Sequence, residues 1–210
     1  MAAISDSAPP TTRTETIRAA ASQIADPAPL GLAAFALTTF VLSVINTDMV
    51  DRSAEPVVFG LALAYGGLAQ FAAGIWEFAK GNTFGATAFC SFGMFWVSFW
   101  YLTGHTDLSG VANLNDTQNG IGLYLLAWAL FTLYMTVAAS RVSLAVLTVF
   151  VLLTITYFIL AIGWFDGDSS GWIKLGGWVG LLTALAAWYA SWAGVTNFTF
   201  KRSVLPTGPR

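Results

Sequence analysis

The chain has 210 residues, of which 9 are lysine or arginine and 11 are aspartate or glutamate, while 56% are hydrophobic and the mean hydropathy is +0.68. Soluble globular domains are about one quarter charged, so a chain that is 10% charged would carry too little surface charge to stay soluble and monomeric. The formal charge of -2 argues against a nucleic-acid partner, and the single cysteine, Cys90, excludes an internal disulfide and a multi-cysteine metal site. We expect a membrane protein without a cofactor and without a metal.

Residues 1–25 are rich in alanine, serine, threonine and proline and carry mixed charge. They lack the apolar run of a signal peptide. Their composition is typical of a segment that cannot bury enough apolar surface to fold. We therefore expect a disordered cytoplasmic tail over residues 1–25.

The charged residues leave six long uncharged intervals: 27–47, 56–76, 81–104, 117–140, 142–165 and 175–200. A helix of about 20 apolar residues crosses the hydrocarbon core of a bilayer, so each interval is long enough for one crossing. A transmembrane β-barrel would instead show stretches of about 10 residues with alternating polarity, which these intervals lack. The predicted fold is all-α, with a six-helix membrane domain over residues 26–200 and a C-terminal tail over residues 201–210.

An even number of crossings places both termini on one side of the membrane. That side holds seven of the nine lysines and arginines, and the other side holds Arg52 and Lys174. Because cytoplasmic loops are enriched in lysine and arginine, we expect a multi-pass protein of the cell membrane with cytoplasmic termini. The outer face then carries seven carboxylates: Asp48, Asp51, Glu55, Asp107, Asp116, Asp166 and Asp168.

The first predicted helix starts in the run DPAPLGL, from Asp26 to Leu32. Proline is tolerated in the first turn of a helix, and Asp26 can cap that turn. Two prolines and Gly31 indicate an irregular helix start, which membrane proteins tolerate only inside protein or beside a wet cavity. Free N–H groups at a helix start also suit a carboxylate ligand. Proline-started helices are common, so the run alone does not establish such a site.

The second predicted helix carries a glycine at every seventh residue, which places these glycines on one slowly drifting stripe. They are Gly60, Gly67, Gly74 and Gly81. Small residues let helices approach closely in lipid. The stripe indicates a packing face within one protomer, a subunit interface or the wall of a narrow pore.

Glu77 lies near the cytoplasmic end of the same helix, on the stripe that also holds Gln70. This carboxylate either snorkels or is capped, paired with Lys80 three residues on, or it contributes to a polar vestibule. Hydroxyls and amides inside the spans either bond within and between helices or line a neutral, hydrogen-bonding path. The spans contain no charged residue between their ends, which excludes a retinal protein and argues against a chain of proton-pumping carboxylates.

The third predicted helix is rich in aromatic residues. Phe89, Phe92, Trp96 and Phe99 fall on one of its faces. Such a stripe more often faces the core or the lipid than forms a gate.

Three runs resemble a known family: DPAPLGL, YGGLAQFAAG from Tyr65 to Gly74, and WEFAKGNTFGATAF from Trp76 to Phe89. From Asp26 to Pro206 the chain resembles the acetate uptake transporter family, which includes the succinate/acetate permeases. The resemblance implies one pore in each six-helix protomer of a homo-hexamer, and passage of acetate, or of succinate in some members, by symport with protons or through a channel. The family signature begins with asparagine where this chain has Asp26. That change disfavours an anion there unless Asp26 caps its own helix or is protonated.

The resemblance also implies a hydrophobic constriction, built from one residue each of the first, third and fifth helices. The matching positions are Phe35, Phe92 and Phe150. The family has tyrosine and leucine at the last two of these positions, so the ring here consists of phenylalanine alone and is narrower at the fifth helix. We expect a gate that favours small acids in their protonated form.

The predicted function is a membrane transporter or anion channel for acetate and related small monocarboxylates, with succinate as a further candidate and with proton assistance. Because no fixed cation lies mid-membrane, a carboxylate would cross as the neutral acid or be held by helix-end dipoles and hydroxyls. An enzyme is not expected, since the sequence shows no nucleophile–base spacing, metal-ligand cluster or phosphate loop; a structural or regulatory scaffold is the alternative. The predicted path and helix-start residues are Asp26, Pro27, Pro29, Leu30, Gly31, Thr38, Thr39, Asn46, Gln70, Glu77, Asn82 and Thr83.

Overall fold

The structure is a computed structural model that describes residues 24–111 and 113–209. The disordered tail predicted for residues 1–25 lies outside these ranges except for its last two positions. Helices fill most of the described chain, and the only β pairing in these ranges is one isolated bridge between Ser143 and Pro209. The elements are α2 (Ala28–Asn46), η1 (Arg52–Ala54), α3 (Pro56–Leu63), η2 (Ala64–Ala69), α4 (Gln70–Lys80), α5 (Thr83–His105), α6 (Leu114–Ala139), α7 (Leu144–Phe165) and α8 (Ser170–Phe200).

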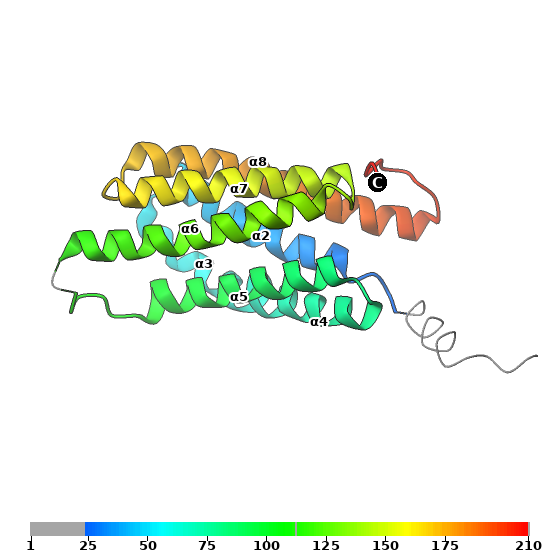
Figure 1. Ribbon diagram of the computed structural model, residues 1–210, viewed down its shortest axis with the longest axis horizontal. Coiled ribbons are helices and arrows are strands. Elements are labelled where there is room, and N and C mark those ends of the chain that lie inside the picture. The colour runs from blue at the N-terminus through cyan, green and yellow to red at the C-terminus, as the bar shows by residue number, and fades with distance from the viewer. Residues whose placement is uncertain (1–23, 112, 210) are drawn as a thin grey trace, which may run out of the picture.

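The helices form one antiparallel bundle (Figure 1). Because α3, η2 and α4 follow one another without a break, they form a single rod, and the described chain contains six long rods. The most extensive backbone contacts join α2 to α8, α8 to α7, α7 to α6 and α4 to α5, whereas the backbones of α5 and α6 lie farther apart and are bridged by aromatic side chains. Both ends of the described chain lie at one end of the bundle, which we call the terminal end. The α5–α6 and α7–α8 connections lie at the other, distal end.

Each predicted span corresponds to one rod, so the predicted all-helical fold is confirmed. Within the described ranges, five rods are long and apolar enough to cross a membrane; they cover 28–46, 52–80, 114–139, 144–165 and 170–200. The sixth, α5, has 23 residues, which suffices for a crossing, but its glycines, hydroxyls and polar aromatics lower its hydropathy. The observed bounds differ from the predicted ones where a charged residue joins a helix, as Asp116 does in α6 and Lys174 in α8.

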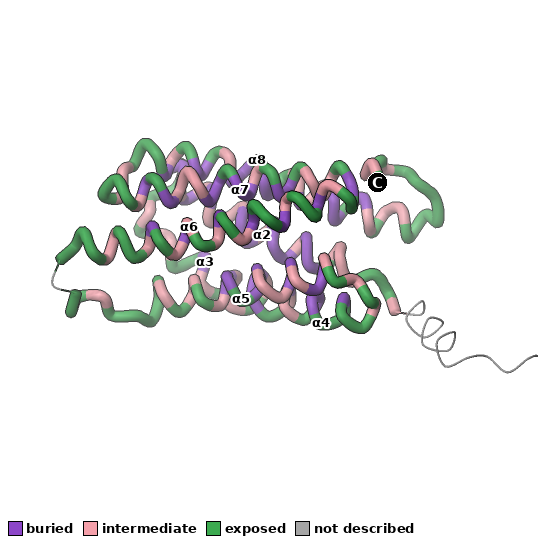
Figure 2. Tube along the Cα trace, viewed as in Figure 1, coloured by how far each residue is buried: buried purple, intermediate pink, exposed green. Residues whose placement is uncertain are grey.

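Burial follows the axis of the bundle, with buried positions on the inward faces and exposed positions outside (Figure 2). The outward faces carry large apolar side chains: Val57, Val137 and Phe198 are 69%, 72% and 75% exposed. Such continuous apolar surface is expected of a protein surrounded by lipid or by further subunits.

The glycines of the second rod have three different environments. Gly67 and Gly74 face α5, and a Cβ atom at Gly74 would lie 2.5 Å from the backbone nitrogen of Cys90. Gly60 faces open space, so close packing within the protomer does not explain it. The prediction that Gly81 is a packing residue is wrong. Gly81 ends α4 with a φ of 80°, the left-handed conformation that glycine commonly adopts after a helix.

The second rod is not a regular α-helix, because residues Ala64–Ala69 widen into a π-helix. The sequence pattern did not predict this segment. Its Gly66 lets α2 approach, since a Cβ atom there would lie 2.6 Å from Oγ1 of Thr38. Single π-helical turns are often found near functional sites, and this one lies beside the helix that carries much of the cavity described below.

The C-terminal segment is held against the terminal end of the bundle. Oδ1 of Asn197 accepts hydrogen bonds from the backbone nitrogens of Val204 and Leu205, at 2.7 and 2.9 Å. The carbonyl of Gly208 accepts a hydrogen bond from the nitrogen of Leu144 at 2.8 Å. The segment thus satisfies a free N–H group at the start of α7.

Candidate functional site

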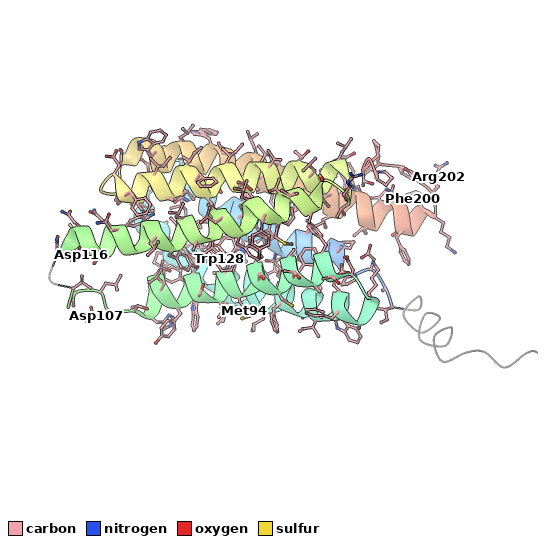
Figure 3. All side chains as sticks on the ribbon, in the orientation of Figure 1. Met94, Asp107, Asp116, Trp128, Phe200 and Arg202 are labelled. Atoms are coloured by element: carbon pink, nitrogen blue, oxygen red, sulfur yellow. The ribbon has the colours of Figure 1, made fainter. Side chains whose placement is uncertain are left out.

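A cavity of about 390 Å³ lies among α2, α5, α6 and α7 and opens at the distal end. The exposed Thr103 and Thr106 lie at its mouth. The lining residues farthest from the mouth along their helices are Phe35, Leu125 and Leu153, near the middle of the bundle. Figure 3 shows the side chains, including the labelled Trp128, that fill the space between α5 and α6. The volume is at the small end of the range for ligand pockets.

The three predicted constriction residues come together beneath this cavity. Phe92 lies between the other two, with ring centroids 6.0 Å from Phe35 and 6.0 Å from Phe150. All three rings are buried. Phe35 contacts the cavity, whereas Phe92 and Phe150 are not part of its lining. The arrangement is an aromatic plug between the cavity and the terminal half of the bundle.

Two further residues extend this plug and were missed by the sequence analysis. Trp128 and Phe131 of α6 pack on Phe92, at centroid distances of 6.0 and 5.4 Å. Leu153 lies on α7, the helix of Phe150, and lines the cavity where Phe150 does not. On the fifth rod, the residue that contacts the floor of the cavity is therefore Leu153. No signal in a single sequence distinguishes it from the neighbouring apolar residues.

Three buried hydrogen-bond donors in the cavity wall have no protein partner. They are Thr39 Oγ1, Trp96 Nε1 and Arg52 Nη2. The indole and guanidinium groups can only donate, and a hydroxyl can donate as well as accept. An unpaired buried donor costs free energy comparable to a lost hydrogen bond, so the wall of the cavity contains three polar groups whose hydrogen bonds are not satisfied by protein. Thr39 was a predicted path residue, whereas Trp96 was interpreted only as part of an aromatic stripe.

Other polar groups in the wall are already bonded to protein. Tyr124 O–H lies 2.7 Å from Ser98 Oγ. Thr156 Oγ1 donates to the carbonyl of Leu152 at 2.8 Å and lies 3.2 Å from Thr183 Oγ1. These hydroxyls hold helices together, as expected for polar residues in membrane helices.

The mouth of the cavity carries a cluster of ion pairs. Arg52 pairs through Nε with Asp48 at 3.3 Å and through Nη1 with Asp168 at 3.1 Å. Lys174 pairs with the other oxygen of Asp48 at 2.7 Å. This hydrogen bond from Lys174 and the charges of Lys174 and Arg52 hold the pKa of Asp48 below its ordinary value of 3.8. Within residues 24–111 and 113–209, no three histidine, cysteine or acidic side chains are grouped to bind a metal.

The helix-start motif lies at the terminal end, away from this cavity. Asp26 Oδ1 accepts from the backbone nitrogen of Ala28 at 3.1 Å and pairs with Lys80 at 2.7 Å. The carbonyl of Pro29 accepts a hydrogen bond from Ser191 of α8 at 2.6 Å. Gly31 makes room for the ring of Phe89. The carboxylate of Asp26 therefore caps its own helix and ties it to α4.

Glu77 does not snorkel and does not form an ion pair with Lys80, so these two interpretations were wrong. Its side chain is fully buried, and Oε2 accepts a hydrogen bond from Asn82 Nδ2 at 2.9 Å. Asn82 in turn caps α5 by accepting from the nitrogen of Gly85 at 3.1 Å. Lys80 is drawn instead to Asp26 at the helix start.

The predicted path residues thus separate into three groups. Thr39 and Asn46 line the cavity. Thr38 and Gln70 are buried outside its lining, and Thr38 donates to the carbonyl of Ala34 at 2.9 Å. The members at the terminal end, also outside the cavity lining, are Asp26, Pro27, Pro29, Leu30, Gly31, Glu77, Asn82 and Thr83.

Comparison with known proteins relates the whole arrangement to one family. The model of the GPR1/FUN34/yaaH family matches residues 10–208. Acetate permease A of Emericella nidulans is 40% identical over 198 residues, which cover 89% of this chain and 66% of that protein. The succinate-acetate/proton symporter SatP of Escherichia coli is 36% identical over 189 residues, covering 89% of this chain and 97% of SatP.

A solved structure shows the same likeness. The structure of the bacterial acetate channel SatP superposes with a TM-score of 0.80 at 36% identity, covering 89% of this chain and 100% of that one. The chain spans between 62% and 66% of the length of the fungal relatives that it matches.

Proposed function

Because the chain belongs to the GPR1/FUN34/yaaH family, we propose that it is a membrane transporter or channel for acetate and related small monocarboxylates, and not an enzyme. The main structural support for this function is the distal cavity, whose wall contains unpartnered donors and whose floor is an aromatic plug. The names of the relatives, an acetate permease and a succinate-acetate/proton symporter, support the substrate class. Succinate is a second candidate substrate.

The donors in the wall suit the polar end of such an acid. Thr39 and Trp96 lie on facing helices near the cavity floor, and each offers a buried donor without a protein acceptor. A carboxylate or carboxylic acid has only oxygen atoms at this end, so it accepts from both. The short apolar tail of acetate then contacts Phe35 and Leu153. The cavity thereby orients the acid above the plug.

The plug makes proton assistance the expected mode of passage. The path from Phe35 past Phe92 offers aromatic carbon in place of water. Transfer of an ionised carboxylate into such surroundings costs many times more than transfer of the neutral acid. Uptake should therefore rise as the pH on the entry side falls. This step needs no titrating protein group, since the proton travels on the substrate.

Charge and surface support an orientation in the membrane and an assembly of several copies. Lys80, Lys201 and Arg202 lie at the terminal end, and the positive-inside rule then makes this end cytoplasmic and the distal cavity external. The exposed apolar faces of the rods offer area for lipid and for neighbouring copies, which supports a homo-hexamer in the cell membrane. Gly60, open to the outside, is a candidate contact in that assembly.

Uptake of labelled acetate into vesicles containing the purified protein tests this function. We expect uptake that saturates, that is faster with an acidic than with a neutral external solution, and that collapses when a protonophore removes the pH gradient. Vesicles without protein are the control. A scaffold would leave acetate entry unchanged, and uptake that stays flat between acidic and neutral pH would contradict proton assistance.

A further inference from the structure

The distal cavity is much larger than the acid that the protein is proposed to carry. Its volume is about 390 Å³, whereas an apolar protein cavity of about 150 Å³ already binds benzene. Acetate is smaller than benzene and leaves most of this space unfilled. Resting on the proposed function, we propose that the cavity also binds neutral, ring-containing molecules with a single polar group, such as cyclohexylmethanol, and that these molecules block the passage of acetate.

The wall of the cavity favours such a molecule because it is mainly apolar. Most of the lining residues are aliphatic or aromatic, and α2, α5, α6 and α7 all contribute to them; they include Leu42, Phe95, Phe99, Leu102, Ile121 and Leu160. Each methylene group that moves from water into apolar surroundings increases affinity about fourfold. A cyclohexyl ring therefore gains far more from this wall than the methyl group of acetate does.

We place the polar end of the ligand at the mouth of the cavity. The hydroxyls of Thr103 and Thr106 are exposed there, and they donate to the carbonyls of Phe99 and Tyr101 at 2.8 and 3.1 Å. A threonine oxygen that donates a hydrogen bond can still accept one, so a ligand hydroxyl can bond to either threonine or to water. One polar group is enough, because the rest of the ligand lies against carbon.

The charges at the mouth favour neutral over anionic molecules. Among the described residues, the charged side chains of the lining are Arg52, Glu55 and Asp168. Arg52 pairs with Asp168 at 3.1 Å, and the adjacent Asp48 and Lys174 pair at 2.7 Å, whereas Glu55 forms no ion pair with a described residue. With all of these groups ionised, one negative charge is in excess. This charge repels a carboxylate and leaves a neutral ligand unaffected.

The aromatic plug explains why a ring would block the path and not follow acetate through it. Below the cavity, Phe92 has neighbouring ring centroids at 6.0 Å for Phe35, Phe150 and Trp128 and at 5.4 Å for Phe131. Protein interiors are close-packed, so a ligand ring as wide as these side chains would have to displace one of them. The methyl group of acetate is narrower. A ring-containing molecule therefore stays in the cavity and occupies the space through which acetate moves.

Ile121 and Leu123 of α6 provide a matched pair of variants. Ile121 lines the cavity, whereas Leu123 is 62% exposed on the outside of the bundle and is not part of the lining. Replacing either residue by phenylalanine adds a ring to the same helix. Only Ile121→Phe adds it to the wall of the cavity, where it takes up space that the ligand needs.

The test is the exchange of labelled acetate across vesicles that have the same neutral pH on both sides, measured at increasing concentrations of cyclohexylmethanol. Equal pH on both sides prevents a collapsed gradient from imitating a block, and exchange in vesicles without protein is subtracted. Unmodified protein and Leu123→Phe should have the same half-blocking concentration. Ile121→Phe should need at least about fourfold more alcohol, the loss of one buried methylene. Cyclohexanecarboxylate, similar in shape but ionised, should block more weakly than the alcohol.

Binding can also be measured without transport, because a ligand that binds only the folded protein raises its melting temperature. In detergent, cyclohexylmethanol should change the Tm of unmodified protein and of Leu123→Phe equally, and both changes should be more positive than that of Ile121→Phe. Alcohols also act on lipid and detergent, so the difference between the two variants measures the contribution of the cavity.

Several outcomes would overturn the proposal. They are the absence of block in unmodified protein, equal half-blocking concentrations in Ile121→Phe and Leu123→Phe, and equal block by the carboxylate and the alcohol. If Ile121→Phe does not fold, Leu102→Phe, at another lining position, takes its place in both measurements. Failure of the proposed function has a different signature: the unmodified protein would exchange no more acetate than vesicles without protein, while the melting temperatures would still report binding in the cavity.

Discussion

In the distal half of the bundle, three residues that line the cavity carry buried donors without a protein partner. In the terminal half, the unpartnered buried atoms of the described chain are acceptors, Gln70 Oε1 and Glu77 Oε1, and neither residue lines that cavity. Both halves belong to the same rods and have similar apolar outer faces. They differ in whether the residues with unpartnered polar atoms line a cavity, as they do in the distal half, or are surrounded by other side chains, as in the terminal half.

This difference separates groups that can serve a ligand from groups that hold helices together. Thr39 and Trp96 are residues of the cavity wall, and their unpartnered polar atoms are buried in that wall. Glu77 instead accepts a hydrogen bond from Asn82, and Gly85 packs directly against its carboxyl group. We therefore expect substitutions in the distal half to change transport more than stability, and substitutions in the terminal half to do the reverse. The plug between the halves should affect both.

The largest effect should come from the plug itself. Phe150→Ala removes a buried ring that packs on Phe92 and Phe84 at centroid distances of 6.0 and 5.2 Å. Such a change costs about 3–5 kcal/mol of stability, and it opens a less selective route between the halves. We expect acetate flux at neutral pH to rise and the ratio of acidic to neutral uptake to fall, as measured in vesicles.

Phe78→Ala is the control for this change, because Phe78 is 58% exposed on the outside of α4. It should leave the flux and its pH dependence as they are. Equal acetate flux in Phe150→Ala and in unmodified protein would show that the ring does not limit passage.

The next effect concerns Glu77 in the terminal half. Glu77→Ala leaves Asn82 Nδ2 without its acceptor and should cost about 1–3 kcal/mol, whereas Glu77→Gln keeps an acceptor in place and should be milder. Thermal unfolding in detergent measures both. Because the proton travels on the substrate in the proposed mechanism, Glu77→Gln should also keep the pH dependence of uptake. If uptake by Glu77→Gln were independent of pH, Glu77 would be the proton carrier. A residue of the terminal half would then act directly in transport, contrary to the proposed difference between the halves.

Much of this organisation could be predicted from the sequence, because exclusion of charge from hydrocarbon is recorded along the chain itself. The gaps between charged residues predicted all six rods, and the family resemblance predicted the residues Phe35, Phe92 and Phe150 that meet in the plug. Which face of each helix lines the cavity was harder to predict. Trp96 and Leu153 line the cavity only because of how α5 and α7 are rotated in the bundle, and composition does not record that rotation.

The burial of Glu77 was missed for a similar reason. Sequence spacing offered Lys80 as its partner, three residues away on the same helix, but Asp26, 54 positions earlier in the chain, takes that lysine. Local spacing cannot reveal a competing partner that tertiary packing supplies. The same holds for Arg52, whose two carboxylates come from different connections of the distal end.

A smaller effect is expected at two neighbouring threonines of α2. Thr39 Oγ1 is unpartnered in the cavity, whereas Thr38 Oγ1 donates to the carbonyl of Ala34 away from it. Thr39→Val should raise the KM for acetate about three- to tenfold, the loss of one hydrogen bond to the substrate, with little change in thermal stability. Thr38→Val, matched in size and chemistry, should leave the KM unchanged. Equal KM changes in the two variants would show that the cavity donors do not select the substrate.

The smallest effect is expected from acid titration of the cluster at the mouth. The hydrogen bond from Lys174 lowers the pKa of Asp48 in the folded protein below its ordinary value of 3.8. A carboxylate with a lowered folded pKa contributes stability that is fully present above its unfolded pKa and is lost as the pH falls through the folded pKa. Unmodified protein should therefore lose more thermal stability below pH 3.8 than Asp48→Asn, which cannot titrate there. Because Asp48 is exposed, solvent screens this contribution. Parallel acid profiles of the two proteins would mean that the pair with Lys174 contributes nothing to folding, and Arg52 would then be held by Asp168 alone.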